Sequence, residues 1–213
     1  MSHRICIINP RTKNIFDLAE PLGLLSLATY LKKAGIVVKI IDEVAGDDVM
    51  EGVRSFKPDL VGFTAITCTY PRAVELMRKI KPLGCRTVIG GVHASSLPEE
   101  TLQDGFDIVV VKEGERMLLD IITSGYTGGI FEATLGKILK PEEFPLMDRS
   151  LVNMDFYCRV GYKATHATGK RIAFVLTSRG CPFRCIFCHN IWADMPMRFI
   201  LPERILEEIK YLV

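Results

Sequence analysis

The architecture of the chain is indicated by a short stretch that reads Thr87-Val88-Ile89-Gly90-Gly91-Val92-His93. Its first four residues, Thr87–Gly90, have the composition of a strand that is buried on both faces, and a second glycine, Gly91, follows directly. Four other short apolar runs, each rich in Val or Ile, read the same way: Arg4–Ile8, Val37–Ile41, Leu60–Thr64 and Ile108–Val111. The first half of the chain therefore contains five predicted strands of this type.

Helical patterns separate these strands. Apolar residues at helical spacing, most often ending at a glycine, predict helices over Pro21–Ala34, Pro71–Leu83 and Glu115–Ser124, with weaker patterns over Asp47–Phe56 and Pro98–Gln103. Five successive β–α units predict a parallel sheet with helices on both faces. We therefore expect an α/β fold of the flavodoxin-like or Rossmann-like doubly wound type over residues 1–125.

The pattern changes after residue 125. Residues 126–170 read as a linker, extended near Pro141 and irregular from residue 151. A further strand is predicted over Arg171–Thr177, and a last helix is predicted to begin at Pro202, because proline is favoured at the first helical position. The apolar stripe of that helix has no predicted partner in the chain, so we expect it to be exposed; it consists of Ile205, Leu206, Ile209 and Leu212.

Composition excludes several classes of protein. Lys and Arg number 27 against 25 Asp and Glu, which is not the basic excess of a nucleic-acid binder. No apolar run approaches the roughly 20 residues of a transmembrane helix, and the N-terminus lacks the pattern of a signal peptide. A cytoplasmic location is therefore expected. The chain has seven cysteines, and because this number is odd they cannot all be paired within the chain. A disulfide framework is therefore not expected.

The carboxyl ends of the predicted strands are polar or rich in glycine. Parallel sheets bind ligands at this edge, and Gly90-Gly91 would let a backbone approach a ligand closely. We expect a large cofactor with a nucleotide-like tail there. His93 fits a ligand-facing residue and an ordinary loop histidine equally well. Neither G-x-G-x-x-G after the first strand nor a P-loop sequence occurs, which disfavours a dinucleotide site and excludes a P-loop.

Three cysteines fall within eight residues. Cys181, Cys185 and Cys188 form a C-x3-C-x2-C motif. Zinc would require a fourth ligand, and His189 adjoins Cys188 too closely to complete a tetrahedron. Three thiolates in a tight loop fit an iron–sulfur cluster better, and three ligands on a four-iron cluster leave one iron open for chemistry.

This motif resembles the signature of the radical SAM superfamily, with the aromatic Phe187 before the last cysteine. Residues 1–125 resemble the cobalamin-binding domain that precedes the barrel in one branch of that family. The matching stretches are Pro21-Leu22-Gly23-Leu24, Lys57-Pro58-Asp59-Leu60-Val61-Gly62, Val88-Ile89-Gly90-Gly91-Val92-His93 and Lys112-Glu113-Gly114-Glu115.

The resemblance implies three cofactors. Cys181, Cys185 and Cys188 would hold a [4Fe–4S] cluster that reductively cleaves S-adenosylmethionine to a 5′-deoxyadenosyl radical, with Phe187 near the adenine. Cobalamin would assist methyl transfer, cyclisation or rearrangement. The residues implied to contact it stand at three strand ends: Thr64, Ala65, Gly90, Gly91, Val92, His93, Glu113, Gly114 and Glu115. A one-electron reductant such as ferredoxin or flavodoxin and a small-molecule or lipid-like substrate are also implied.

The chain departs from the family in two ways. A D-x-H-x-x-G motif is absent, and Asp42-Glu43-Val44-Ala45-Gly46 stands near where it would fall. Residues 171–213 supply only the first β–α unit of a TIM-type barrel, whereas a whole barrel takes roughly 200 residues or more. We therefore expect the N-terminal part of an enzyme that is inactive by itself. The alternatives are a non-catalytic corrinoid-binding module with a vestigial cysteine loop, and a zinc-binding interaction protein.

Overall fold

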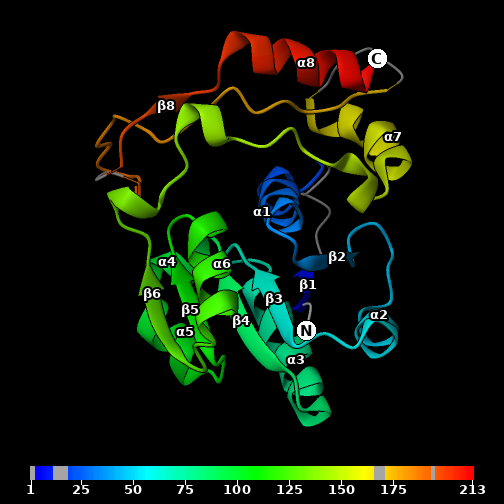
Figure 1. Cartoon of the computed structure of the whole chain (residues 1–213), viewed down its shortest axis with the longest axis vertical. Coiled ribbons are helices and arrows are strands. Elements are labelled where there is room, and N and C mark those ends of the chain that lie inside the picture. Colours follow the sequence, from blue (N-terminus) through cyan, green and yellow to red (C-terminus); the bar gives the residue numbers. More distant parts are fainter. Residues whose placement is uncertain (1–2, 12–18, 166–170, 193–194) are drawn as a thin grey trace.

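The computed structural model describes residues 3–11, 19–165, 171–192 and 195–213. Its centre is a sheet of six parallel strands in the order β2-β1-β3-β4-β5-β6 (Figure 1). The strands are β1 (Arg4–Asn9), β2 (Val37–Asp42), β3 (Leu60–Thr64), β4 (Arg86–Gly90), β5 (Ile108–Val111) and β6 (Gly129–Glu132). The first five are the predicted strands, and their order confirms the flavodoxin-like prediction.

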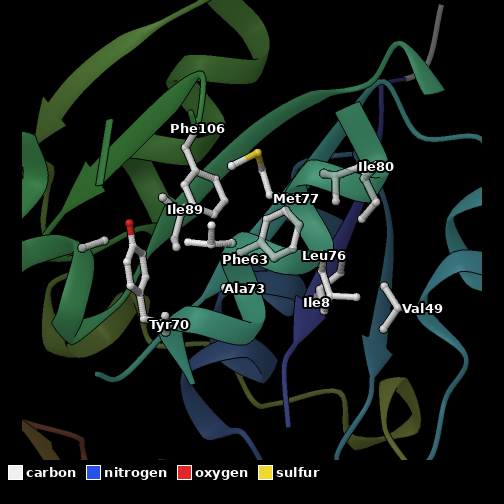
Figure 2. Packing of buried hydrophobic residues seen from close by; sticks show 14 of the residues in the cluster. Ile8, Val49, Phe63, Tyr70, Ala73, Leu76, Met77, Ile80, Ile89 and Phe106 are labelled. Carbon is white, nitrogen blue, oxygen red and sulfur yellow. The ribbon is translucent and has the colours of Figure 1, made fainter. Parts of the chain in front are cut away.

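Helices cover both faces of this sheet. On one face pack α1 (Leu22–Lys33) and α6 (Glu115–Ser124), and on the other pack α2 (Val49–Phe56) and α3 (Tyr70–Ile80). The short helices α4 (Val92–Ser96) and α5 (Pro98–Gln103) follow β4. Figure 2 shows the α3 side of the core, where Met77 and Phe106 lie close to the strand residues Phe63 and Ile89. Burial on both faces explains why these strands are almost wholly apolar.

The segment after α6 is more ordered than its sequence indicates. It begins with β6, which pairs with β5 and was not predicted. Three 3-10 turns follow, at Leu135–Lys137, Pro141–Glu143 and Arg149–Leu151. The prediction of irregular structure from residue 151 is wrong for the helix α7 (Met154–Thr165), and the last residues of the predicted linker, 166–170, lie outside the described residues.

The predicted strand over Arg171–Thr177 is wrong. None of its residues lies in a strand, and its backbone bonds run to separate places: the Ile172 amide donates to the Cys158 carbonyl, and the Thr177 carbonyl accepts from the Ile200 amide. The Phe174 amide donates to Glu20 Oε1 at 2.7 Å, and the Phe174 carbonyl accepts from Arg149 Nη2 at 2.8 Å. A two-residue antiparallel pair comes later, between β7 (Ser178–Arg179) and β8 (Arg198–Phe199), and it closes a hairpin around the cysteines.

The last helix, α8 (Pro202–Leu212), begins at the predicted proline and turns Ile205 and Glu208 toward the protein. Glu208 is buried and forms an ion pair with Arg149, with 2.6 Å between its Oε1 and Nη2, while Leu206 is 52% exposed and Ile209 is 44% exposed. The prediction of an exposed apolar stripe is therefore confirmed for Leu206 and Ile209, whereas Ile205 and Leu212 are partly buried. No helix within the described ranges is both long and apolar enough to cross a bilayer.

Candidate cofactor site

A cavity of about 360 Å³ lies at the carboxyl edge of the sheet, on the side covered by α1 and α6. Its floor is formed by strand residues that include Ile7, Val88 and Val110, and α1 contributes Leu27. Leu176, Arg179, Gly180 and Trp192 of the C-terminal segment also line it. The volume lies within the usual range of small-molecule sites, and the lining is mainly apolar.

Glycines shape this cavity. Gly23, Gly62 and Gly90 all line it, and each has room for a Cβ atom. A Cβ at Gly23 would meet no protein atom within 4 Å, and one at Gly90 would come no closer than 3.5 Å to the Val110 carbonyl oxygen. These positions therefore leave open space that side chains would otherwise fill, as a cofactor-binding surface requires.

Gly91 has a different role from Gly90. It adopts φ +95°, and a Cβ there would lie 2.9 Å from both the Ala65 carbonyl oxygen and Thr64 Oγ1. The loops that follow β3 and β4 are joined at this point, because the Ala65 amide donates to the Gly90 carbonyl and the Ala65 carbonyl accepts from the His93 amide. Gly91 thus permits close approach of two protein loops.

Alanine at position 91 is expected to destabilise the protein by about 2 kcal/mol, because it combines left-handed backbone strain with a clash against backbone atoms. Alanine at position 90 meets only ordinary van der Waals contacts and should change stability by less than about 0.5 kcal/mol. Urea unfolding of the two variants measures both values. Equal stability of the two variants would contradict this account of Gly91.

The structure brings together six of the nine residues predicted to contact the cofactor. Thr64, Gly90, Gly91, Glu113, Gly114 and Glu115 line the cavity. The other three do not appear among its lining residues. Ala65 is buried in the loop junction, the Val92 side chain is exposed, and His93 is buried beneath the loop.

His93 fits the interpretation of a structural histidine better than that of a ligand. Its ring stacks on Tyr70, with 3.8 Å between centroids, and its Nδ1 lies 3.3 Å from Thr67 Oγ1. Burial lowers its pKa, so the neutral imidazole is favoured. The sequence could not distinguish the two interpretations, because the stacking partner is more than twenty positions away along the chain.

Sequence reasoning did not assign several lining residues to the site, among them Gly23, Gly62, Leu27, Arg179 and Trp192. Gly23 could have been recognised from the sequence. Glycine destabilises a helix, so a glycine in the first turn indicates that another group needs the space beside the backbone there. Arg179 and Trp192 carried none, because their approach to the sheet depends on how the C-terminal segment folds back.

The three clustered cysteines lie in the hairpin closed by β7 and β8. All three are free thiols; Cys181 is half-buried, and Cys185 and Cys188 are exposed. Phe187 is 89% exposed and lies outside the cavity lining. Within the described ranges, no three His, Cys, Asp or Glu side chains converge on a point that could hold a single metal ion. Gly180 opens the loop at φ +95°, where a Cβ would lie 2.8 Å from the Pro196 carbonyl oxygen.

A doubly wound parallel sheet with a glycine-lined cavity at its carboxyl edge defines a class of cofactor-binding α/β domains. Residues 11–122, more than half of the chain, match the family described as the B12 binding domain. The chain therefore belongs to the B12-binding domain family, which confirms the cobalamin-binding resemblance.

Named enzymes are similar to almost the whole chain. The anaerobic magnesium-protoporphyrin IX monomethyl ester cyclase of Rubrivivax gelatinosus is 30% identical over 91% of this chain and 39% of its own length. The hopanoid C-3 methylase of Methylococcus capsulatus is 28% identical over 92% of this chain and 41% of its length. The cytidylyl-2-hydroxyethylphosphonate methyltransferase of Streptomyces wedmorensis is 26% identical over 87% and 47%. The chain thus spans less than half the length of each of these three relatives.

Proposed function

We propose that this chain forms the cobalamin-binding and cluster-binding part of a radical SAM methyltransferase or cyclase. The observation that carries the proposal is the position of the cysteine hairpin, whose Arg179 and Gly180 line the same cavity as the strand ends. The relatives named as cyclases and methyltransferases support an enzyme of this kind. When bound, the cluster would supply the electron that cleaves S-adenosylmethionine, and cobalamin would assist methyl transfer, cyclisation or rearrangement.

The chain's own residues would hold and orient these groups. The apolar cavity between α1 and the sheet would exclude water from the part of cobalamin that it accepts, and the backbone at Gly62 and Gly90 would let that part approach closely. Cys181, Cys185 and Cys188 would each ligate a different iron, so their sulfur atoms need not converge on one point. Glu113 and Glu115 would fix the approach of the hairpin.

The sequence predicts the domain division 1–125, 126–170 and 171–213; because β6 pairs with β5, we propose that the cofactor domain extends past residue 125 to include β6, and that residues 171–213 begin a barrel. The substrate and the reductant would be recognised by residues beyond those that line this cavity. We accordingly propose that the 213-residue chain by itself does not turn over S-adenosylmethionine. Positioning of the reacting groups supplies much of such catalysis, and that requires the remaining walls of a barrel.

The cobalamin part is tested by replacing Gly23 with leucine. The new side chain meets no protein atom within 4 Å at its Cβ and adds volume to the cavity wall, so the fold should be retained while binding weakens. An overfilled site costs about 1–3 kcal/mol, so the cobalamin affinity measured by equilibrium dialysis should be about 5- to 150-fold lower.

Gly136→Leu is the matched control, because Gly136 also has open space around it but lies outside the cavity lining. Its cobalamin affinity should equal that of the unmodified chain. Absence of corrinoid binding by the unmodified chain would overturn the proposal. Corrinoid binding without iron and sulfide after anaerobic reconstitution would indicate the non-catalytic module instead, and stoichiometric zinc would indicate the interaction protein.

A further inference from the structure

Two arginines lie side by side at the base of the cysteine hairpin. Arg179 in β7 and Arg198 in β8 are paired directly across the two strands. Like charges at opposed positions of an antiparallel pair repel each other. This hairpin is only two residues deep on each strand, so its own backbone bonds contribute little against that repulsion. Something outside the hairpin has to neutralise the pair.

Two glutamates that follow β5 provide the neutralising charge. Glu113 accepts from Arg198 through both of its carboxylate oxygens, one of them 3.0 Å from Nη1. Glu115 Oε1 accepts from Arg179 Nη1 at 2.7 Å. Glu113 is 5% exposed and Arg198 is 7% exposed, so solvent screens this pair weakly. Paired, forked contacts of this kind fix geometry as well as charge.

The rest of the cluster comes from two further segments. The Phe144 ring lies 4.9 Å from the guanidinium carbon of Arg179 and 5.7 Å from that of Arg198. The Leu139 carbonyl accepts from Arg198 Nη1 at 2.6 Å. Ser26 of α1 accepts from Arg179 and donates to Glu115, each at 2.7 Å. Four separate parts of the chain therefore meet at the base of the hairpin.

The backbone before Glu113 is held in an uncommon conformation. Lys112 adopts φ +71°, a left-handed value that few residues other than glycine take. Its amide donates to Ser95 Oγ at 2.9 Å, and its ammonium group pairs with Glu132 at 2.6 Å. Such strain persists only where the surroundings fix it. The turn that aims Glu113 at the hairpin is thus set by contacts to α4 and β6.

We infer that Arg198, held by Glu113, is a positioning residue that docks the cysteine hairpin onto the cofactor-binding edge of the sheet. Glu113 lines the cavity and Arg198 does not, so the ion pair links the cavity wall to the loop that carries the cysteines. A ligand in the cavity and the order of the hairpin are then coupled, and the coupling is reciprocal. This inference deepens the proposed function and rests on it for the identity of the cofactor.

Hydrogen exchange of the whole chain tests the inference. In Arg198→Gln without any cofactor, the amides of the hairpin, residues 177–200, should exchange with solvent at least about tenfold faster than in the unmodified chain. The amides of β1 to β5 should keep their protection. Arg198→Lys keeps the charge but loses the forked guanidinium contact. Its exchange rates should lie between those of the unmodified chain and those of Arg198→Gln. Arg204→Gln on α8, which breaks an ion pair with Glu207, is the control and should leave residues 177–200 unchanged.

An unpaired Glu113 left buried in Arg198→Gln could unfold the chain. The double variant Glu113→Gln with Arg198→Gln removes both charges and should show the same local loss of protection.

Added hydroxocobalamin should slow exchange in the hairpin of the unmodified chain but not in that of Arg198→Gln. Unchanged exchange at residues 177–200 in both cofactor-free variants would overturn the docking role. Equal slowing by hydroxocobalamin in Arg198→Gln would overturn the coupling. Failure of the unmodified chain to bind hydroxocobalamin would overturn the proposed function and leave the cofactor-free comparison valid.

Discussion

Replacing Cys185 with alanine is expected to abolish assembly of the iron–sulfur cluster. A four-iron cluster held by three thiolates keeps only two of these ligands when one is removed, and two thiolates are too few to hold it during assembly. After anaerobic reconstitution, the unmodified chain should hold about four irons and show broad absorption in the visible range. Cys185→Ala should hold almost none. Iron analysis and absorption spectra measure both quantities.

Two cysteine variants serve as controls for this experiment. Cys68 is exposed like Cys185 but stands in the loop after β3, and Cys158 is buried in α7. Cys68→Ala and Cys158→Ala should both retain the full iron content. Because Cys185 is exposed, its loss should not unfold the chain, and circular dichroism should be unchanged. A full cluster in Cys185→Ala would contradict the assignment of the motif.

The second large effect is on stability, at Arg149. This buried guanidinium pairs with Glu208 of α8 at 2.6 Å and lies 3.8 Å from Glu20. Arg149→Met would leave the buried carboxylates of Glu208 and Glu20 without their cationic partner, which costs about 3–5 kcal/mol. The free energy of unfolding in urea should fall by that amount.

Further substitutions separate charge from packing. Arg149→Met combined with Glu208→Leu and Glu20→Gln should recover most of the lost stability, because no buried charge is then left unpaired and an apolar pair of similar volume is often as stable as a buried ion pair. Arg204→Met breaks the more exposed pair with Glu207 and should cost less than about 1 kcal/mol. A loss below about 1 kcal/mol in Arg149→Met would show that the buried pair contributes little.

The sequence predicted the sheet well because its signals are local. Each of the first five strands is a short apolar run bounded by polar or glycine residues, and that pattern follows directly from burial on both faces. The strand β6 was not predicted from the sequence, because it is a half-exposed edge strand of four residues that begins with glycine. One sequence signal for helix α7 was present, namely Asn153 directly before the helix, because asparagine is a preferred N-cap residue. In the structure the Phe156 amide donates to the Asn153 side chain at 3.0 Å.

Residues 171–177 show why the remainder could not be predicted. Their apolar, β-branched composition favours a strand, but a strand also needs a neighbouring strand to pair with its backbone. At Phe174 those bonds go instead to Glu20 and Arg149, which lie far away in the sequence. The same holds for the candidate site. Its glycine-rich strand ends could be predicted from the sequence, whereas the docking of Arg179 and Arg198 could not, because it depends on tertiary packing.

The pairing of β6 with β5 bears on how such a domain can be transplanted. The last strand of the sheet comes from the segment that leads to the hairpin, and α7 of that segment also reaches back, with the Tyr157 hydroxyl donating to buried Asp42 at 2.6 Å. A recombinant piece that stops at residue 125 would expose the edge of β5 and leave Asp42 without that donor. The portable unit for grafting or fusion therefore extends through Thr165.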